Sequence, residues 1–168
     1  MISPAGAVTT LAGSSWQGFD DGRGAAARFN CPTGVAVDAS GVVFVADRNN
    51  HRIRRITNGV VDTLAGSGER GIADGAGAAA QFYSPSGLVL DPATGHLLVA
   101  DQLNHRIRAV DPRSGAVSTL AGSGARGADD GDAAAASFKE PCGIAVDVQG
   151  GIIVADTTNN LVRRLTRT

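Results

Sequence analysis

The residues best suited to chemistry in this sequence are two histidines, each placed four positions after an aspartate. His51 follows Asp47, and His105 follows Asp101. A histidine beside a carboxylate is common in metal sites and in general acid–base catalysis. The segment occurs a third time, however, with Asn160 in place of the histidine. Because an active site is needed only once and this motif recurs, we expect structural roles, with no catalytic residue, metal or cofactor.

The aspartate, asparagine and arginine of this segment recur at matching positions. Short Asp and Asn side chains readily hydrogen-bond the backbone of a turn. The arginines are expected to lie across a sheet with their stems packed, where they could pair with one of the motif carboxylates. The predicted structural set is Asp47, Asn50, His51 and Arg54; Asp101, Asn104, His105 and Arg108; and Asp156, Asn159 and Arg163.

A second set of carboxylates precedes a glycine and an alanine-rich run that ends in phenylalanine. The pairs are Asp21 with Phe29, Asp74 with Phe82, and Asp130 with Phe138. Clustered carboxylates could hold calcium. The spacing is not that of a known calcium loop, and the middle copy offers one aspartate. We expect instead that the aspartate caps a short helical turn and that the phenylalanine fills the space between units.

The elements that position these motifs come in three copies, each opened by Leu-Ala-Gly. The copies start at Leu11, Leu64 and Leu120, at spacings of 53 and 56 residues. A period in this range is typical of arrays in which one supersecondary unit stacks on the next. We predict a single domain over residues 1–168, with repeats at about 6–58, 59–114 and 115–168.

Each copy contains four short runs rich in valine, isoleucine and leucine. In the first copy they are 35–38, 42–46, 51–56 and 60–65. The connections are too short for a crossover helix, so neighbouring strands must be antiparallel. The first two runs are apolar on both sides, so each sheet needs cover on both faces. The sequence therefore predicts an all-β fold of radially stacked four-stranded sheets, a β-propeller.

Three phrases recur in order: Phe-x-x-Pro-x-Gly with a hydrophobic run ending in Asp, then Val-Ala-Asp-x-x-Asn-His-Arg-Ile-Arg, then Thr-Leu-Ala-Gly. Asp47–Arg54 and Asp101–Arg108 match the middle phrase, and 156–163 departs from it slightly. This pattern covers nearly the whole chain and resembles the NHL repeat. The resemblance implies propeller blades with strands a to d from centre to rim, most often six blades, and most commonly a role in binding proteins or peptides.

The resemblance also implies two alternatives, an NHL-like zinc lyase that cleaves peptidyl-hydroxyglycine and the RNA-binding NHL domains of tripartite-motif ubiquitin ligases. The lyase uses His, Tyr and Arg, but this chain has a single tyrosine, Tyr83, and one histidine outside the repeated motif, His96. The chain has 15 Lys plus Arg, 16 Asp plus Glu and a net charge of -1. This balance gives no electrostatic case for nucleic acid or a membrane surface.

The order of the predicted strands suggests how the sheets close into a ring. Ala7–Leu11 is predicted as a d strand and 161–165 as a c strand. Three blades are too few, because propellers have about 4 to 8. We expect a homodimer with a six-bladed ring, in which each N-terminal d strand completes the last blade of the partner. The alternatives are a piece of a longer propeller, another closed number of blades, or an excised or engineered fragment without a function of its own.

Meander geometry puts the long d-to-a loops and the b-to-c turns on one face. Loops of this length are usually functional, and here they differ most between copies. We therefore predict a non-enzymatic scaffold that binds a protein or peptide through this loop face. The candidate ligand-binding residues are Trp16, Gln17, Phe19, Glu69, Arg70, Ile72 and Arg126.

Two further features of the sequence bear on the cellular compartment. Residues 1–6 lack the charged and hydrophobic regions of a secretory signal, which leads to an expectation of a cytoplasmic protein without a membrane segment. Cys31 and Cys142 lie in corresponding loops and are expected to be free thiols.

Overall fold

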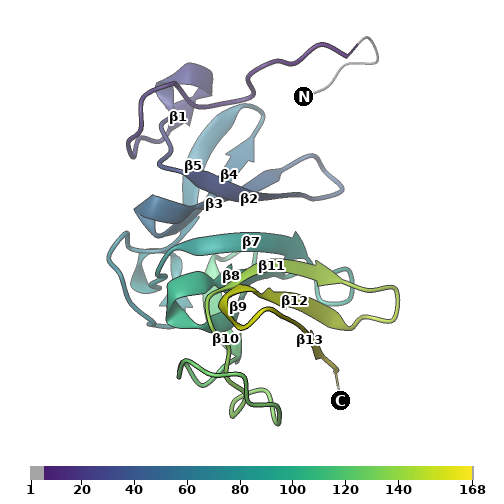
Figure 1. The fold of residues 1–168 in the computed structure, drawn as a ribbon. Helices are drawn as coiled ribbons and strands as arrows, with labels where there is room; N and C mark the ends of the chain where they lie inside the picture. Colours follow the sequence, from purple (N-terminus) through teal and green to yellow (C-terminus); the bar gives the residue numbers. More distant parts are fainter. Residues whose placement is uncertain (1–5, 168) are drawn as a thin grey trace.

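The computed structural model describes residues 6–167, which form three antiparallel sheets stacked one on the next (Figure 1). The first sheet runs in the order β1 (Gly22–Arg23), β5 (Val60–Ala65), β4 (Arg52–Thr57), β3 (Val43–Asp47) and β2 (Pro32–Val37). The second runs β6 (Gly75–Ala76), β10 (Ala116–Ala121), β9 (Arg106–Val110), β8 (Leu97–Asp101) and β7 (Pro85–Leu90). The third runs β11 (Pro141–Val146), β12 (Ile152–Asp156) and β13 (Leu161–Leu165). The predicted all-β fold of antiparallel meanders is confirmed.

Five short 3₁₀ turns interrupt the strands. They are η1 (Gly24–Ala26), η2 (Arg48–Asn50), η3 (Gly77–Ala79), η4 (Gln102–Asn104) and η5 (Thr157–Asn159). In Figure 1, η2 and η4 lie on the left of the molecule, whereas the β2–β3 and β11–β12 hairpins point to the right. The b-to-c turns and the a-to-b turns therefore occupy opposite faces, as a meander requires.

Two apolar cores lie between the sheets. The first core includes Phe44 and Ile53 from sheet one and Phe82 and Leu97 from sheet two, all at most 1% exposed. The second joins sheets two and three through residues such as Ile107, Phe138 and Val154. The strands of sheet two can thus bury both sides, because a sheet covers each of its faces, whereas sheets one and three are each covered by another sheet on one face.

The innermost strands β2, β7 and β11 lie side by side. A Cβ on Gly34 would collide with the Ser86 carbonyl oxygen, and one on Gly87 would collide with that of Cys142. The Thr33 hydroxyl also donates to the Ser86 oxygen at 3.3 Å. The glycines of the first two Pro-x-Gly phrases, Gly34 and Gly87, are thus explained by the close approach of neighbouring backbones at the centre of the array.

The structure differs from the sequence-based expectation at both ends of the strand order. In sheets one and two, a two-residue fifth strand from the long loop pairs with the d strand, Gly22 with Val61 in the first case. Ala7–Leu11 is not a strand in the single chain and contains only an isolated bridge at Val8. Over the described residues, the third sheet accordingly has three strands.

The two ends of the predicted range fall partly outside the described residues. Residues 1–5, on which the expectation about a secretory signal rests, and residue 168 are not described. Within 6–167, no helix is long and apolar enough to cross a membrane.

Candidate functional site

One buried arginine fixes the long loop of each repeat to its sheet. The side chain of Arg54, 0% exposed, donates to Asp47 at 2.8 Å and to Asp21 at 2.6 Å. Its guanidinium carbon lies 5.2 Å from the centre of the Phe29 ring. The charge is thus paired twice and stacked on an aromatic face, which offsets the cost of removing it from water.

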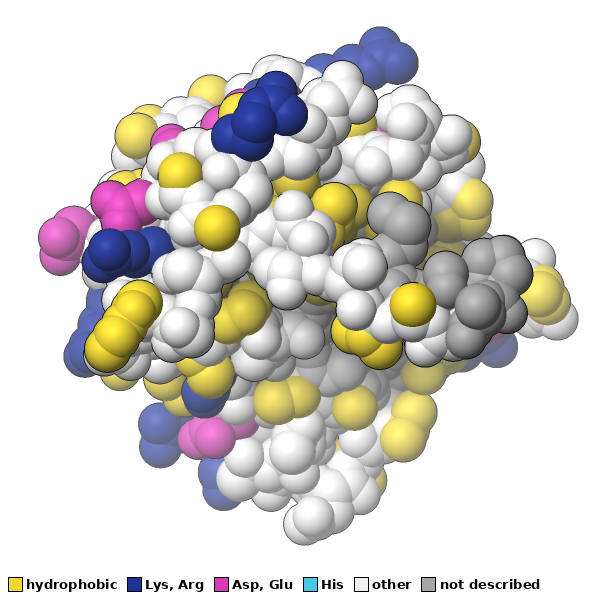
Figure 2. Space-filling view, turned by 90° about the horizontal axis from the view of Figure 1, so that it is seen from above, with side chains coloured by type: hydrophobic (Ala, Val, Ile, Leu, Met, Phe, Trp, Pro, Cys, Tyr) yellow, Lys and Arg dark blue, Asp and Glu magenta, His cyan; other side chains and the backbone are white. Residues whose placement is uncertain are grey.

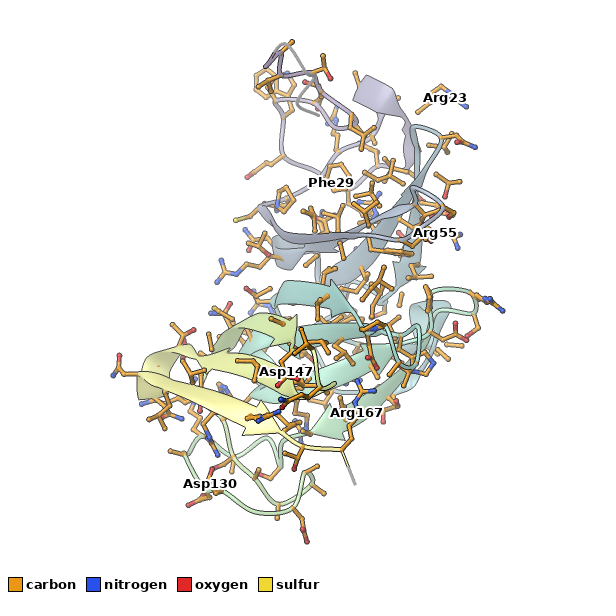
Figure 3. The ribbon with its side chains drawn as sticks, turned by 90° about the vertical axis from the view of Figure 1, so that its right-hand side faces the viewer. Arg23, Phe29, Arg55, Asp130, Asp147 and Arg167 are labelled. Atoms are coloured by element: carbon orange, nitrogen blue, oxygen red, sulfur yellow. The ribbon has the colours of Figure 1, made fainter. Side chains whose placement is uncertain are left out.

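The same arrangement recurs in the other two repeats. Arg108 binds Asp101 at 2.8 Å and Asp74 at 2.7 Å, and Arg163 binds Asp156 at 3.1 Å and Asp130 at 2.6 Å. Figure 3 shows Asp130 in the loop below the third sheet, whereas Phe29 lies in the upper part of the view, above the first sheet.

The expected helix-capping role of the loop aspartates is wrong. The residue that precedes the 3₁₀ turn η1 is Arg23, and it makes no side-chain capping bond; Ala76 stands in the same place before η3. Asp21 and Asp74 instead bind the buried arginines. An ion pair with a buried cation outweighs the modest gain from capping a turn of three residues.

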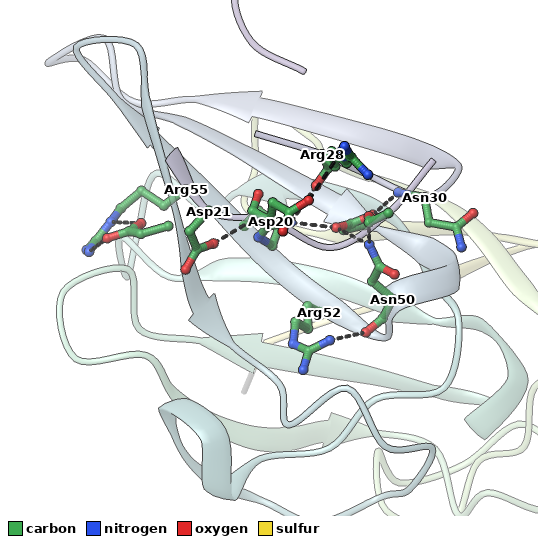
Figure 4. A network of polar contacts seen from close by, with 11 residues as sticks. Asp20, Asp21, Arg28, Asn30, Asn50, Arg52 and Arg55 are labelled. Atoms are coloured by element: carbon green, nitrogen blue, oxygen red, sulfur yellow. Dashed lines mark hydrogen bonds and ion pairs between the residues drawn. The ribbon is translucent and has the colours of Figure 1, made fainter. Parts of the chain in front are cut away.

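The b-to-c turn is hydrogen-bonded to the long loop through its asparagine. Asn50 Nδ2 donates to Asp47 and to the Gly18 carbonyl, both at 2.8 Å, and the Asn30 N–H donates to Asp47 at 2.8 Å (Figure 4). Asn104 and Asn159 make the matching bonds to Gly71 and Gly127. These bonds hold the turn and the loop together on one face of the sheets.

The histidines join one sheet to the next. His51 adopts a left-handed φ of 54°, and its Nδ1 accepts the Ser84 N–H at 3.1 Å. His105, with φ of 55°, accepts the Glu140 N–H at 3.1 Å in the same way. Acceptance at Nδ1 requires the neutral imidazole, with its hydrogen on Nε2. Burial, with the nearby Arg70 charge, lowers the pKa of His51 and favours that form.

Arg126, one of the candidate ligand-binding residues, lies against the second of these histidines. Its Nε is 3.0 Å from Nε2 of His105. A neutral imidazole carries one hydrogen, so the two ring nitrogens cannot both accept. We assign the hydrogen bond to Nδ1, because the same backbone bond recurs at His51. Burial and the charge of Arg126 lower the pKa of His105.

The remaining loop-face candidates are exposed and come from two loops. Phe19 is 42% exposed, with the Arg52 guanidinium carbon 3.7 Å from its ring centre, and Ile72 is 53% exposed. Arg70 lies over the Tyr83 ring at 5.2 Å, and Glu69 is exposed beside it. The loop face thus offers separate apolar side chains set among charges of both signs.

Trp16 and Gln17 come from the same long loop as Phe19 and lie near the start of β2 in sheet one. They line a groove of about 540 Å³ together with Phe29, Cys31 and Pro32. Trp16 is 73% exposed. The grouping of all seven candidates on one binding surface stays a prediction.

Sequence reasoning missed individual apolar residues on the two outer flanks. On sheet one, Val35 is 66% and Val37 58% exposed, and on sheet three, Val162 is 77% exposed. Figure 2 looks down on the flank of sheet one and shows hydrophobic side chains across its middle, with most charged ones toward the left and upper rim. The repeat pattern could have indicated these residues, because they match Leu88, Leu90 and Ile107 of sheet two, which are also apolar.

The side chains that could hold a metal are dispersed or already bonded. Among residues 6–167, no three His, Cys, Asp or Glu side chains gather as a metal site would require. Cys31 is an exposed free thiol and Cys142 a partly buried one.

Comparison with known proteins identifies the repeat. The family model for the NHL repeat matches residues 29–56, 82–109 and 138–165. The chain belongs to the NHL-repeat family. It is 35% identical to NHL repeat-containing protein 2 of Gallus gallus, over 83% of this chain and 21% of that protein. This NHL chain thus spans about a fifth of the length of that curated relative.

Solved structures show the same fold. An auxiliary nutrient binding protein from Bacteroides thetaiotaomicron superposes with a TM-score of 0.69 at 26% identity, over 77% of this chain and 36% of that one. A catalytically inactive virginiamycin B lyase from Staphylococcus aureus, with quinupristin, superposes with a TM-score of 0.54 at 14% identity, over 82% of this chain and 38% of that one. The second likeness concerns the fold alone.

Proposed function

We propose that this NHL chain is a non-enzymatic scaffold that binds a protein or peptide through its loop face. The observation that carries the proposal is the exposure of Phe19 and Ile72 on loops that are themselves held by ion pairs to buried arginines. A fixed loop with an exposed apolar side chain loses little conformational entropy on binding. The histidines support a non-enzymatic role, because their Nδ1 atoms are occupied by backbone N–H groups.

A peptide-display selection on the purified chain tests this proposal. Peptides selected on the chain should bind the double variant Phe19→Ala, Ile72→Ala at least about tenfold more weakly, because apolar anchors dominate such interfaces. They should bind Val148→Ala unchanged, since Val148 lies on the opposite face in the β11–β12 hairpin and is 103% exposed. Equal binding to the double variant, or a selection that yields no peptide, would contradict the proposal.

We also propose that two copies of the chain close a six-bladed ring. The exposed valines on both outer flanks support this, because soluble proteins rarely leave contiguous apolar faces uncovered. Two copies give six blades, within the range of about 4 to 8 found in propellers, and three copies would exceed it. The N-terminal segment around Ala7–Leu11 would then supply the d strand that the partner's third sheet needs.

The solution mass tests ring closure. Light scattering should give twice the chain mass of 16.9 kDa. A monomer at all concentrations would reject a closed ring of two chains and leave the flanks to other partners, such as further repeats of a longer chain.

A further inference from the structure

Residues on the two outer flanks depart from the repeat in matched pairs. The first pair involves the residue after the left-handed position. This residue is Arg52 in sheet one and Arg106 in sheet two, but Leu161 in sheet three. Each arginine reaches across to the next repeat, where Arg52 donates to the Ser67 carbonyl at 2.6 Å. Leu161 has no group that could make that bond.

The glycine that faces this arginine changes at the opposite flank. A Cβ on Gly68 would collide with the Arg52 guanidinium, and one on Gly124 would collide with that of Arg106. The matching residue of the first repeat is Ser15, which carries a Cβ. Gly68 and Gly124 have φ of +92° and +88°, whereas Ser15 does not adopt a positive φ. The first repeat therefore lacks the glycine against which an arginine packs, and the third repeat lacks the arginine.

The second pair concerns the histidine and the loop residue beside it. Inside the molecule, His51 lies near the charge of Arg70, and His105 contacts Arg126. On the outer flanks, the matching residues are Asn160 and Gln17. Two carboxamides can donate to and accept from each other without leaving a buried charge. On the outer flanks, an uncharged amide side chain thus replaces both the histidine and the arginine of the inner junctions.

At two positions, the backbone of the outer flanks keeps the geometry of the inner junctions. Asn160 has φ of 56°, like His51, and Cys31 has φ of 55°, like Ser84. The Asn160 side chain can therefore offer its amide oxygen to the Cys31 N–H, in the way that His51 serves Ser84. Gly143 on the innermost strand would meet only Ala155 at an ordinary 3.4 Å if it carried a Cβ. It has the space that Gly34 and Gly87 use to approach the next strand.

We infer that the third sheet of one chain recognises the first sheet of a second copy through the pairs Leu161 with Ser15 and Asn160 with Gln17. This inference rests on the proposed ring closure and names the contacts that make it specific. A sheet that presented arginine and histidine, as sheets one and two do, would collide with Ser15. A first repeat with glycine in place of Ser15 would leave a gap beside Leu161. Trp16, next to Ser15, extends the apolar contact made by Leu161.

A compensating pair of substitutions tests the inference. Leu161→Arg should raise the dimer dissociation constant at least about tenfold, because the guanidinium meets the Ser15 side chain and is buried without a partner. Adding Ser15→Gly should restore most of the affinity, since this pair of residues already occurs at both inner junctions. Sedimentation equilibrium measures the constants, and thermal unfolding checks that each variant folds. Val148→Arg adds the same side chain at a fully exposed turn and should leave the constant unchanged.

The outcomes separate this inference from ring closure itself. A wild-type chain that stays monomeric would overturn both. A dimeric wild type whose Leu161→Arg variant associates equally well, or is not rescued by Ser15→Gly, would overturn only the proposed pairing. Gly143→Ala is a second test of the same interface, and it introduces no charged side chain. Its Cβ fits the single chain but should collide with the partner's innermost strand, so an unchanged dissociation constant would also contradict the inference.

Discussion

Ile53 and Ile107 are 0% exposed, whereas Val162, at the same place in the third sheet, is 77% exposed. Leu88 is 7% exposed, and its counterpart Val35 is 66% exposed. The inner junctions and the outer flanks thus present corresponding side chains to opposite surroundings. Each sheet of this fold therefore takes part in two interfaces, and its stability depends on a neighbouring sheet more than on its own strand pairing.

The largest contrast is expected for the buried ion pairs. Asp101→Ala should cost about 3–5 kcal/mol in the free energy of unfolding, because it leaves the fully buried Arg108 short of a partner. Asp156→Ala should cost roughly half as much, since Arg163 is 10% exposed and its other partner, Asp130, is 93% exposed. Urea unfolding followed by circular dichroism measures both. Equal losses in the monomer would contradict this account.

Apolar truncation should separate the two regions next. Ile107→Ala is expected to lower the free energy of unfolding by about 2–5 kcal/mol, because it opens a cavity between sheets two and three. Val162→Ala should change monomer unfolding little, since most of that side chain is already in solvent. Comparing both variants at dilute and at high protein concentration sharpens the contrast. In a closed ring, the Val162→Ala loss should appear only at the higher concentration.

Backbone contact at the centre of the array gives a smaller effect. Gly87→Ala should destabilise the fold by about 1–3 kcal/mol, because the added Cβ meets the Cys142 carbonyl on the next strand. Gly143→Ala should leave monomer stability nearly unchanged, since its Cβ would make an ordinary contact. Thermal unfolding of the two variants, measured under the same conditions on the monomer, compares the two losses of stability. A larger loss for Gly143→Ala would reverse the assignment of inner and outer strands.

The smallest effect is expected from acid. The pKa values of His51 and His105 are lowered below the usual 6.5, first by burial. Their contribution to stability should therefore be complete above pH 6.5 and be lost as the pH falls from 6.5 toward the lowered values, because the unfolded chain then binds more protons. The double variant His51→Asn, His105→Asn, which places in both inner repeats the residue type of Asn160, should show a flatter profile in this window. An unchanged profile would mean that other groups cause the acid sensitivity.

Much of this architecture could be predicted from the sequence. The three Pro-x-Gly phrases and the Val-Ala-Asp strands predicted antiparallel meanders, because strand length, turn residues and two-sided apolar runs are local properties. An ion pair between Arg54 and a motif carboxylate such as Asp47 was one possibility that the recurrence of both residues allowed. The second partner, Asp21, could not be predicted, since it lies 33 residues away on a loop whose path is set by tertiary contacts.

The role of the histidines shows the same limit. Their repetition argued against catalysis, but the sequence does not reveal that His51 bonds the next repeat rather than its own turn. That bond requires the left-handed backbone at both His51 and Ser84. The sequence also does not reveal that Trp16 lines a groove with Phe29 and Cys31, because that arrangement depends on the path of the folded loop.

The repeat, the strand pattern and the family could be predicted from the sequence, since they follow from side-chain order along short segments. Which of the corresponding positions are buried and which are exposed depends on the stacking of the sheets. Burial depends on whether another sheet lies against a given face, and that is a property of the stack rather than of the residue. The matched changes at Ser15, Gln17, Asn160 and Leu161 acquire meaning only once the two outer flanks have been located.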